Sequence, residues 1–168
     1  LPVLRGLDEL FAGRLQTRYA TGAAIEECVE TADLIIGSVL VPGASAPKLV
    51  TEAMVKRKQA GTVVVDVAID QGGCFETSHP TTHEAPHYLS HDVVHYCVAN
   101  MPGAVPQTAS AALNQATLPF VLAIAEAGPE AALRQDAQLR SGLAVYGGQL
   151  VSEAVGRAHG LAVSQPNF

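Results

Sequence analysis

The stretch that decides the fold runs from Val63 to Gly73 and reads Val-Val-Val-Asp-Val-Ala-Ile-Asp-Gln-Gly-Gly. It opens with a continuous run of β-branched residues, which is typical of a strand buried on both faces of a parallel sheet. The run then breaks at Asp70, which is followed by a glutamine and two glycines. Because open α/β sheets bind ligands just beyond the carboxyl ends of their strands, Asp70 is a candidate catalytic or cofactor-binding residue.

Similar apolar runs lie on both sides of this stretch, and helical patterns alternate with them. The run over residues 34–41 ends at the turn signal Pro42-Gly43. Strands that alternate with helices over short loops are the signature of βαβ units, so we predict an α/β fold with a partial Rossmann-type, doubly wound parallel sheet followed by C-terminal helices. In the first part of the chain we expect strands over residues 15–20, 34–41, 63–69 and 93–98, and helices over residues 4–11 and 50–59 and after Thr21.

The character of the chain changes after Gly73. Residues 74–92 are polar and rich in Thr, Pro and His, which predicts a long loop with a short strand near Tyr88. Pro119 lies inside a long helical run and predicts a kink or a join between two helices. In this second part we expect helices over residues 108–127, 130–140 and 150–159, and a short strand over residues 143–146.

The composition of the 168 residues describes a well-buried globular chain, with 48% hydrophobic and 15% charged residues. The net charge is −6 and no basic stripe occurs, so we expect no nucleic-acid partner. No apolar run reaches the roughly 18 residues that a membrane-spanning helix needs, so we expect no membrane partner. Cys28, Cys74 and Cys97 are widely spaced, which predicts free thiols in a reducing cytosol, buried as small hydrophobic residues.

Three predicted strand ends should face one region of the sheet, namely residues 38–43, 68–73 and 99–103. This arrangement is half of a dinucleotide-binding fold, whose other half carries G-x-G-x-x-G after a strand. No such glycine motif occurs in the 168 residues. We therefore expect that the sequence begins downstream of this motif and represents the C-terminal portion of a longer protein.

The segment from about Arg14 to Gly128 resembles the alanine dehydrogenase / nicotinamide nucleotide transhydrogenase family. Long strings of residues carry the resemblance, and they are far more specific than a lone glycine motif. They read Ala-Asp-Leu-Ile-Ile-Gly-Ser-Val-Leu-Val-Pro-Gly at residues 32–43, Ala-Pro-Lys-Leu-Val at 46–50, Asp-Val-Ala-Ile-Asp-Gln-Gly-Gly-Cys-Phe-Glu at 66–76 and Val-Ala-Asn-Met-Pro-Gly-Ala-Val-Pro at 98–106.

Within this family, the resemblance implies an NAD-dependent alanine dehydrogenase. Such an enzyme interconverts L-alanine with pyruvate and ammonia, lies in the cytoplasm and forms a homo-oligomer, for which the family suggests a homohexamer. Residues 1–105 would be the C-terminal half of the NAD-binding Rossmann domain. Residues 106–168 would form a connecting helix and a return segment to the substrate domain.

The same resemblance implies roles for individual residues. Asp70 would be the catalytic carboxylate. Ala20 and His79 depart from the family pattern, in which Ser and Arg are common at these positions. The residues that would contact NAD are Val39 and Leu40 on the adenosine side, and Val67, Ala68, Ile69, Asp70, Val98, Ala99, Asn100 and Met101 near the nicotinamide and its ribose.

Each candidate also has a structural interpretation. Asp70 could be a turn-forming residue whose side chain caps local backbone N–H groups. Gly72 and Gly73 could admit a closely bound cofactor or could merely form a tight turn. Asn100 could cap a helix, and Met101 could simply fill the core.

Other polar residues favour structural roles. Asp66 lies within the strand run, and we expect it to make a structural hydrogen bond. Histidines at positions 79, 83, 87, 91 and 95 recur every four residues, a spacing that on a helix would suggest a metal site. Pro80 and Pro86 interrupt this segment, so we predict a loop with exposed histidines and no metal, and a packed His95 in the last strand.

Two other functions remain open at the level of the sequence. An NAD-binding subunit of a proton-translocating transhydrogenase would belong to the same family, but there we expect Glu at the position of Asp70. A non-catalytic NAD-binding or assembly module belongs to a different class. The isolated chain could be only such a module, since it lacks the glycine motif and half of the cleft.

Overall fold

The computed structural model describes residues 1–166 of the chain. These residues divide into two compact units, each of which is described by itself. The first unit comprises Leu1–Leu40 and Ala46–Ala99, and the second comprises Val41–Ser45 and the chain from Asn100 onward.

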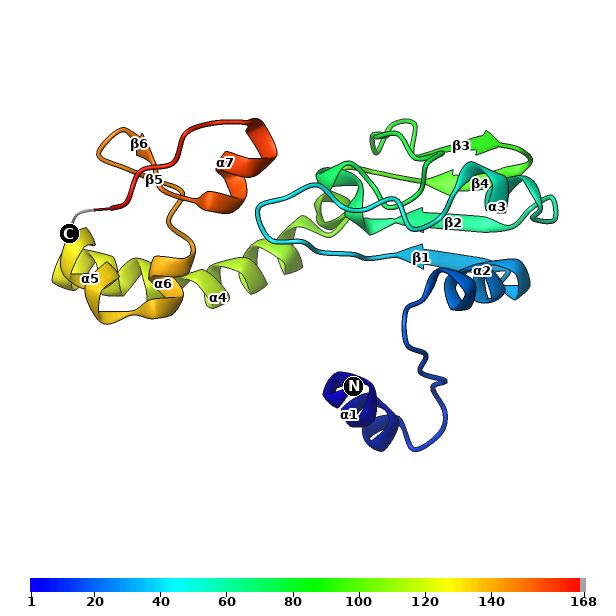
Figure 1. Cartoon of the computed structure of the whole chain (residues 1–168), viewed down its shortest axis with the longest axis horizontal. Coiled ribbons are helices and arrows are strands. Elements are labelled where there is room, and N and C mark those ends of the chain that lie inside the picture. The colour runs from blue at the N-terminus through cyan, green and yellow to red at the C-terminus, as the bar shows by residue number, and fades with distance from the viewer. Residues whose placement is uncertain (167–168) are drawn as a thin grey trace. The chain divides into compact units, whose positions relative to one another are not determined.

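A four-stranded sheet forms the centre of the first unit (Figure 1). Its strand order is β1-β2-β4-β3, in which β1, β2 and β4 run parallel and β3 runs antiparallel to β4. The parallel pairs place Ile35 beside Val64 and Val64 beside His95. The parallel strands β1 and β2 are joined through a helix, which confirms the predicted α/β class. The strands span Leu34–Gly37 (β1), Val63–Asp66 (β2), His87–Ser90 (β3) and Val93–Tyr96 (β4).

Two helices of this unit begin at hydroxyl side chains that cap them. The N–H of Ala24 donates to Oγ1 of Thr21 at 3.2 Å, as the sequence predicts, and the N–H of Met54 donates to Oγ1 of Thr51 at 3.3 Å. Because the first turn of a helix has N–H groups without helical partners, such an acceptor fixes where the helix starts. The helices of the unit span Pro2–Phe11 (α1), Gly22–Thr31 (α2) and Glu52–Lys56 (α3).

The hydrophobic core of the first unit packs α2 and α3 against the sheet. Val64 on β2 is fully buried, and Val55 on α3 is 1% exposed. Complete burial of a side chain of this kind stabilises a fold by about 1.5–3 kcal/mol. The core is mainly aliphatic and consists of Val29, Ala46, Val50, Val55, Val64, Ala68, Cys74, Phe75 and Val93.

The predictions for the first two strands need correction. Residues 15–20 form no strand, because no strand of the described chain lies beside them to complete a ladder of backbone hydrogen bonds. The second predicted strand is shorter than expected, since β1 ends at Gly37. It is also not buried on both faces: Leu34 and Ile36 are 54% and 60% exposed, because β1 is an edge strand of the sheet.

Other boundaries in this unit differ less. Helix α3 covers only part of the predicted helix over residues 50–59. Residues 74–92 form a loop that contains β3, which confirms the short strand predicted near Tyr88. The hairpin from β3 to β4 turns at His91 and Asp92, whose φ angles are +53° and +60°. Two consecutive left-handed residues match the twist of the strands that they connect.

Helix α4 is the longest element of the second unit (Figure 1). It is one helix that includes Pro119, so the alternative of a join between two helices is wrong. An interior proline removes one backbone hydrogen bond, and the bonds of the remaining turns keep the helix continuous. The elements of this unit are η2 (Met101–Ala104), α4 (Pro106–Ala127), α5 (Pro129–Gln135), α6 (Ala137–Ser141), β5 (Val145–Tyr146), β6 (Gln149–Leu150) and α7 (Glu153–His159).

The predicted helix over residues 130–140 is two helices, because Asp136 interrupts it. This residue is extended, and its Oδ1 accepts hydrogen bonds from the N–H groups of Gln138 and Leu139 at 2.7 and 3.1 Å. An aspartate in this role starts a new helix. The predicted short strand before the glycine pair is confirmed as β5, and the last helix begins at Glu153 because Leu150 pairs in β6.

Helix α4 also bears on the expected absence of a membrane span. Its 22 residues are long and apolar enough to cross a membrane, by length and composition only, and none of them is buried in the described chain. The expectation that no apolar segment reaches this length was therefore wrong. One such helix is weak evidence for a membrane span.

The cysteines follow the prediction in two of three cases. Cys74 and Cys97 are buried, at 2% and 0% exposure, and all three thiols are free. Cys28 is exposed on α2, so its predicted burial is wrong. Its helix buries Val29 instead, which lies one position further around the helix.

Candidate functional site

Asp70 lies in a short 3₁₀ helix, η1, that spans Val67–Gln71 and directly follows β2. The predicted strand therefore ends at Asp66, four residues before Asp70. Ala68 and Ile69 are 6% and 3% exposed, so they anchor η1 in the interior, whereas Asp70 is exposed. The segment is therefore anchored by buried residues and presents an exposed carboxylate at the end of a parallel strand. A residue that contacts a ligand needs this placement.

Two glycines reverse the chain immediately after η1. Gly72 and Gly73 have φ angles of +91° and +74°, which are left-handed and favour glycine. Their N–H groups donate to the carbonyls of Ile69 and Ala68, each at 3.0 Å. Of the two interpretations that the sequence left open, the structure supports a tight turn for this pair.

Gly73 has a further reason to lack a side chain. A Cβ atom at this position would lie 2.6 Å from Oδ2 of Asp66, whereas a Cβ atom at Gly72 would meet nothing within 4 Å. Of these two glycines, only Gly73 has neighbours close enough to exclude a methyl group. Asp66 lies this close to Gly73 because its carboxylate bonds the backbone of the next residue, Cys74.

Asp66 makes the structural hydrogen bonds that the sequence led us to expect. Its carboxylate is fully buried, and its Oδ2 accepts hydrogen bonds from the N–H groups of Cys74 at 3.0 Å and Phe75 at 3.4 Å. Burial and, next, the charge of Asp66 raise the pKa of the Cys74 thiol to about 12. Cys74 is therefore a protonated, unreactive thiol at neutral pH.

Three strand ends meet at one edge of the sheet. Because β1, β2 and β4 are parallel neighbours, the segments that follow Gly37, Asp66 and Tyr96 leave the sheet at the same edge. The sequence predicted that residues 38–43, 68–73 and 99–103 face one region. The arrangement agrees with this prediction for those of the residues that belong to the first unit. Segments 41–43 and 100–103 belong to the second unit.

The candidate residues at this edge differ in accessibility. Leu40, Val67, Asp70 and Ala99 are exposed, so their side chains can reach a ligand. Ala68, Ile69 and Val98 are buried and can offer a ligand only backbone groups, and Val39 is half-buried. In the second unit, Asn100 is exposed with a φ of +61°, and Met101 is half-buried at the start of η2. Their contacts with a cofactor remain predictions.

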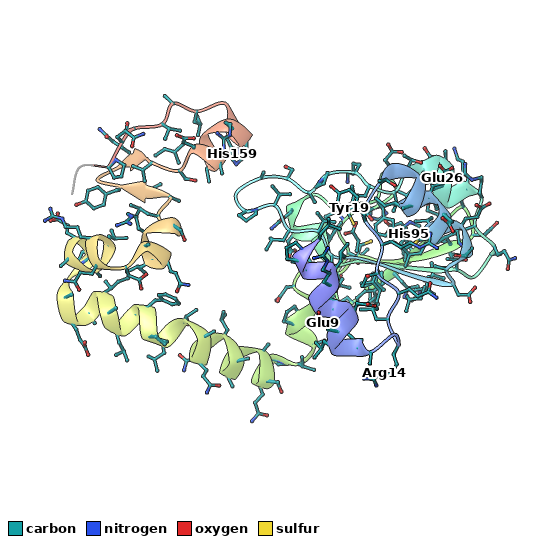
Figure 2. The ribbon with its side chains drawn as sticks, turned by 60° about the horizontal axis from the view of Figure 1, so that its bottom comes forward. Glu9, Arg14, Tyr19, Glu26, His95 and His159 are labelled. Atoms are coloured by element: carbon teal, nitrogen blue, oxygen red, sulfur yellow. The ribbon has the colours of Figure 1, made fainter. Side chains whose placement is uncertain are left out.

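A cavity of about 530 Å³ lies in the first unit, against the open edge of β1 and the segment that follows this strand. Its walls come from α2, β1 and the segment that contains Tyr19, which Figure 2 labels. Of the residues predicted to contact NAD, only Val39 lines it. Cys74 and Phe75 also line the cavity, so it borders the turn that follows Asp70, although Asp70 itself does not line it.

The polar loop after η1 encloses a stack of aromatic rings that the sequence did not predict. The rings of His79 and Tyr88 lie 3.7 Å apart between centroids, and those of Tyr88 and His95 lie 5.1 Å apart. The Tyr88 hydroxyl donates to the carbonyl of Thr77 at 2.9 Å and accepts from the N–H of His79 at 3.0 Å. The stack holds the loop onto the sheet, and among residues 1–166 no cluster of His, Cys, Asp or Glu could bind a metal.

His95 is the buried member of this stack, as the sequence predicted for a strand residue, and Figure 2 shows it within the sheet. Its Nε2 lies 2.7 Å from Oγ1 of Thr77, and its Nδ1 lies 3.0 Å from the carbonyl oxygen of Val93. Burial, more than any other cause, lowers the pKa of His95 from its usual value. The imidazole is therefore neutral in the folded protein at neutral pH.

The lowered pKa of His95 predicts a loss of stability in mild acid. The unfolded chain takes up a proton on this residue near pH 6.5, while the folded protein does so only at lower pH, so the free energy of unfolding falls as the pH drops below about 6.5. We expect His95→Gln to weaken this dependence in urea denaturation between pH 7.5 and about pH 5. His87→Gln, which removes an exposed imidazole from β3, is the matched control. An unchanged dependence in His95→Gln would contradict the assignment.

Comparisons with known proteins agree on one family. The family model "Alanine dehydrogenase/PNT, C-terminal domain" matches residues 1–153. The alanine dehydrogenase of Halomonas elongata is 55% identical over 161 residues, which cover 96% of this chain and 43% of that protein. The alanine dehydrogenase of Mycolicibacterium smegmatis is 54% identical over 154 residues, which cover 92% and 42%.

Solved structures give the same result. A structure titled L-alanine dehydrogenase matches with a TM-score of 0.78 and 50% identity, covering 94% of this chain and 43% of that one. The transhydrogenase of Sinorhizobium meliloti matches with a TM-score of 0.64 and 25% identity, covering 89% and 40%. The chain thus spans less than half the length of the relatives that it matches.

Proposed function

Because the chain belongs to the alanine dehydrogenase/PNT C-terminal domain family, we propose that the protein that contains it catalyses the reversible, NAD-dependent oxidative deamination of L-alanine to pyruvate and ammonia. Identities of 50–55% to alanine dehydrogenases support this activity over that of the more distant transhydrogenase. The single observation that carries the proposal is the exposed Asp70 on a firmly anchored turn at the carboxyl edge of the parallel sheet. This chain would supply that carboxylate and part of the NAD site.

The residues at this edge fit the nicotinamide half of NAD. Val67, Asp70 and Ala99 are exposed there, while the buried side chains of Ala68 and Ile69 anchor the backbone between Val67 and Asp70. Oε1 of Gln71 is buried and accepts no hydrogen bond within the described chain, and an unpaired buried acceptor is costly. An N–H donor such as the carboxamide of nicotinamide would satisfy it. The G-x-G-x-x-G motif that holds the phosphates in such folds does not occur in these 168 residues, so we propose that the rest of the complete protein supplies it.

Asp70 would act as the acid and base of the reaction. When bound, NAD accepts the hydride that leaves the α-carbon of L-alanine. Water must then add to the resulting imine, losing a proton as it attacks, before ammonia leaves and pyruvate forms. A carboxylate beside the α-carbon can take that proton and return it to the departing amine.

The remaining parts of the proposal extend from the chain to the complete protein. We propose a cytoplasmic enzyme that assembles into a homo-oligomer, with a homohexamer as the specific form. Residues 1–105 would complete an NAD-binding domain, and residues 106–168 would connect it to a substrate domain. The exposed apolar surface of α4 is consistent with burial against other parts of such an assembly.

The experiment that tests the activity uses the complete gene product. We expect it to form NADH when L-alanine and NAD are supplied together, and to consume NADH when pyruvate and ammonia are supplied, as followed by NADH absorbance. D-alanine is the matched control substrate. Hydride exchange between NAD(H) and NADP(H) without turnover of L-alanine would instead identify a transhydrogenase subunit, and binding of NAD without either reaction would identify a non-catalytic module.

A further inference from the structure

Lys48 contacts the turn after Asp70 from outside. Its ammonium group donates to the carbonyl oxygens of Gly72 at 2.5 Å and Phe75 at 3.1 Å. These acceptors lie 24 and 27 residues away in the sequence. A lysine that bonds two carbonyls of one turn fixes the separation and orientation of both.

The backbone around Lys48 is paired with the same turn. The N–H of Ala46 donates to the carbonyl of Gln71 at 2.8 Å, and the N–H of Leu49 donates to the carbonyl of Cys74 at 2.8 Å. Val50 and Phe75 form a parallel bridge just beyond. The Lys48 side chain therefore starts from a backbone whose position relative to the turn is already fixed.

Asp66 contacts the turn from inside. Its buried carboxylate accepts the N–H groups of Cys74 and Phe75 at 3.0 and 3.4 Å. Phe75 is thus held at both of its polar groups, since its N–H donates to Asp66 and its carbonyl accepts from Lys48. Phe75 is also fully buried, so the residue that receives both contacts is anchored in the core.

We propose that Lys48 and Asp66 are positioning residues for Asp70. The ammonium and the carboxylate hold the carbonyl and N–H groups of residues 72–75 and so fix the turn that presents the Asp70 side chain. This inference rests on the proposed function, because it assigns a purpose to the orientation of Asp70. Neither residue touches a reactant in this assignment, since the polar atoms of Lys48 and Asp66 make hydrogen bonds with the backbone of the turn.

The assignment predicts a specific kinetic effect. If the turn loosens, Asp70 is misplaced relative to the reacting carbon, and a displacement of about 1 Å can cost about a hundredfold in rate. Binding of NAD, which uses many other contacts, should change far less. Loss of Lys48 should therefore lower kcat and leave the KM for NAD nearly unchanged.

The test compares three variants of the complete gene product. Lys48→Met removes the donors, and Lys48→Arg restores donors that can reach two carbonyls. Lys58→Met is the matched control, because Nζ of Lys58 also donates to a backbone carbonyl, that of Glu30 at 2.8 Å, but not to the turn. Lys48 is exposed, so its replacement leaves no cavity in the core.

The measurements are steady-state kinetics and deuterium exchange of the backbone over residues 70–76. For Lys48→Met we expect kcat to fall by about tenfold or more, the KM for NAD to stay within about twofold, and exchange over residues 70–76 to accelerate. Lys48→Arg should recover most of kcat, and Lys58→Met should match the wild type. Unchanged kcat or unchanged exchange in Lys48→Met overturns the proposal, as does a raised KM for L-alanine at unchanged kcat, which would make Lys48 a substrate contact.

Failure of the proposed function would look different. Deuterium exchange needs no turnover, so it reports on the hold of Lys48 on the turn even in a protein without dehydrogenase activity. If Asp70→Asn retained full turnover, the catalytic role of Asp70 would be wrong, whatever Lys48→Met does. If Asp70→Asn is inactive and Lys48→Met is as active as the wild type, only the positioning role is wrong.

Discussion

Replacing Asp70 with Asn is expected to lower kcat for L-alanine oxidation by about 10²–10⁴-fold, the range that general acid–base catalysis contributes. The amide keeps the size of the carboxylate but can neither accept nor release a proton near neutral pH. Asp70 is exposed, and the residues that anchor η1 are Ala68 and Ile69, so the substitution leaves the fold in place. Affinity for NAD should therefore change little.

The measurement is steady-state kinetics of the complete gene product in both directions, together with titration of NAD against the variant. Asp92→Asn is the matched control, because it neutralises an exposed aspartate in a turn of the same unit, at a position where Asn also tolerates a φ of +60°. We expect Asp92→Asn to retain wild-type kcat. Wild-type turnover in Asp70→Asn would show that the turn serves a structural purpose alone.

Local patterns in the sequence predicted the elements that depend on local interactions. Thr21 starts a helix because its hydroxyl lies three residues from the N–H that it accepts. The run that begins at Val63 forms a strand because β-branched residues suit a pleated, buried surface. The parallel pairing of β1 and β2 follows from the helix α3 that connects them.

Features that depend on distant residues could not be read in this way. The strand β2 ends early because Asp66 turns its carboxylate to N–H groups eight and nine residues later, and no local pattern encodes that contact. The exposure of Leu34 and Ile36 depends on which strands lie beside β1. The order of the strands in space decides it, not the apolar character of the run.

The same limit applies to the candidate site. The resemblance to a family drew attention to Asp70, but the contacts of Lys48 join residues 24 to 27 positions apart. The stack of Tyr88 and His95 arises because the antiparallel register of β3 and β4 places these residues side by side. The sequence predicted a loop here and a packed His95, but not which rings lie beside this imidazole. A signal that could have revealed the stack is the pair of aromatic residues at facing positions of a predicted hairpin.

Gly73→Ala is expected to destabilise the protein far more than the same change at the neighbouring Gly72. The new Cβ would lie 2.6 Å from Oδ2 of Asp66, a contact that real Cβ atoms essentially never show, so the carboxylate or the backbone must move. If the carboxylate moves, buried N–H groups of Cys74 and Phe75 lose their acceptor, at about 1–3 kcal/mol for each unsatisfied group. The left-handed backbone adds about 1–2 kcal/mol for any residue with a Cβ.

Gly72→Ala separates these two causes. Gly72 has the same left-handed backbone, with a φ of +91°, but open space where its Cβ would lie. Gly72→Ala should therefore lower the free energy of unfolding only by the backbone contribution of about 1–2 kcal/mol. Gly73→Ala should lower it by about 3 kcal/mol or more. Urea denaturation of the complete gene product measures both losses.

A double variant shows whether Asp66 is the cause. In an Asp66→Ala background the carboxylate is gone, so the additional cost of Gly73→Ala should shrink toward that of Gly72→Ala in the wild type, with Cβ of Ser78 at 3.2 Å and Cδ1 of Ile69 at 3.3 Å as the remaining close neighbours. Residues in contact show such non-additive effects, whereas independent sites add within about 0.3–0.5 kcal/mol. Additive losses from Asp66→Ala and Gly73→Ala would mean that the carboxylate of Asp66 is not what requires a glycine at residue 73. A strongly non-additive result would show that Asp66 excludes a side chain at residue 73, and that the turn presenting Asp70 is shaped by the carboxylate beneath it.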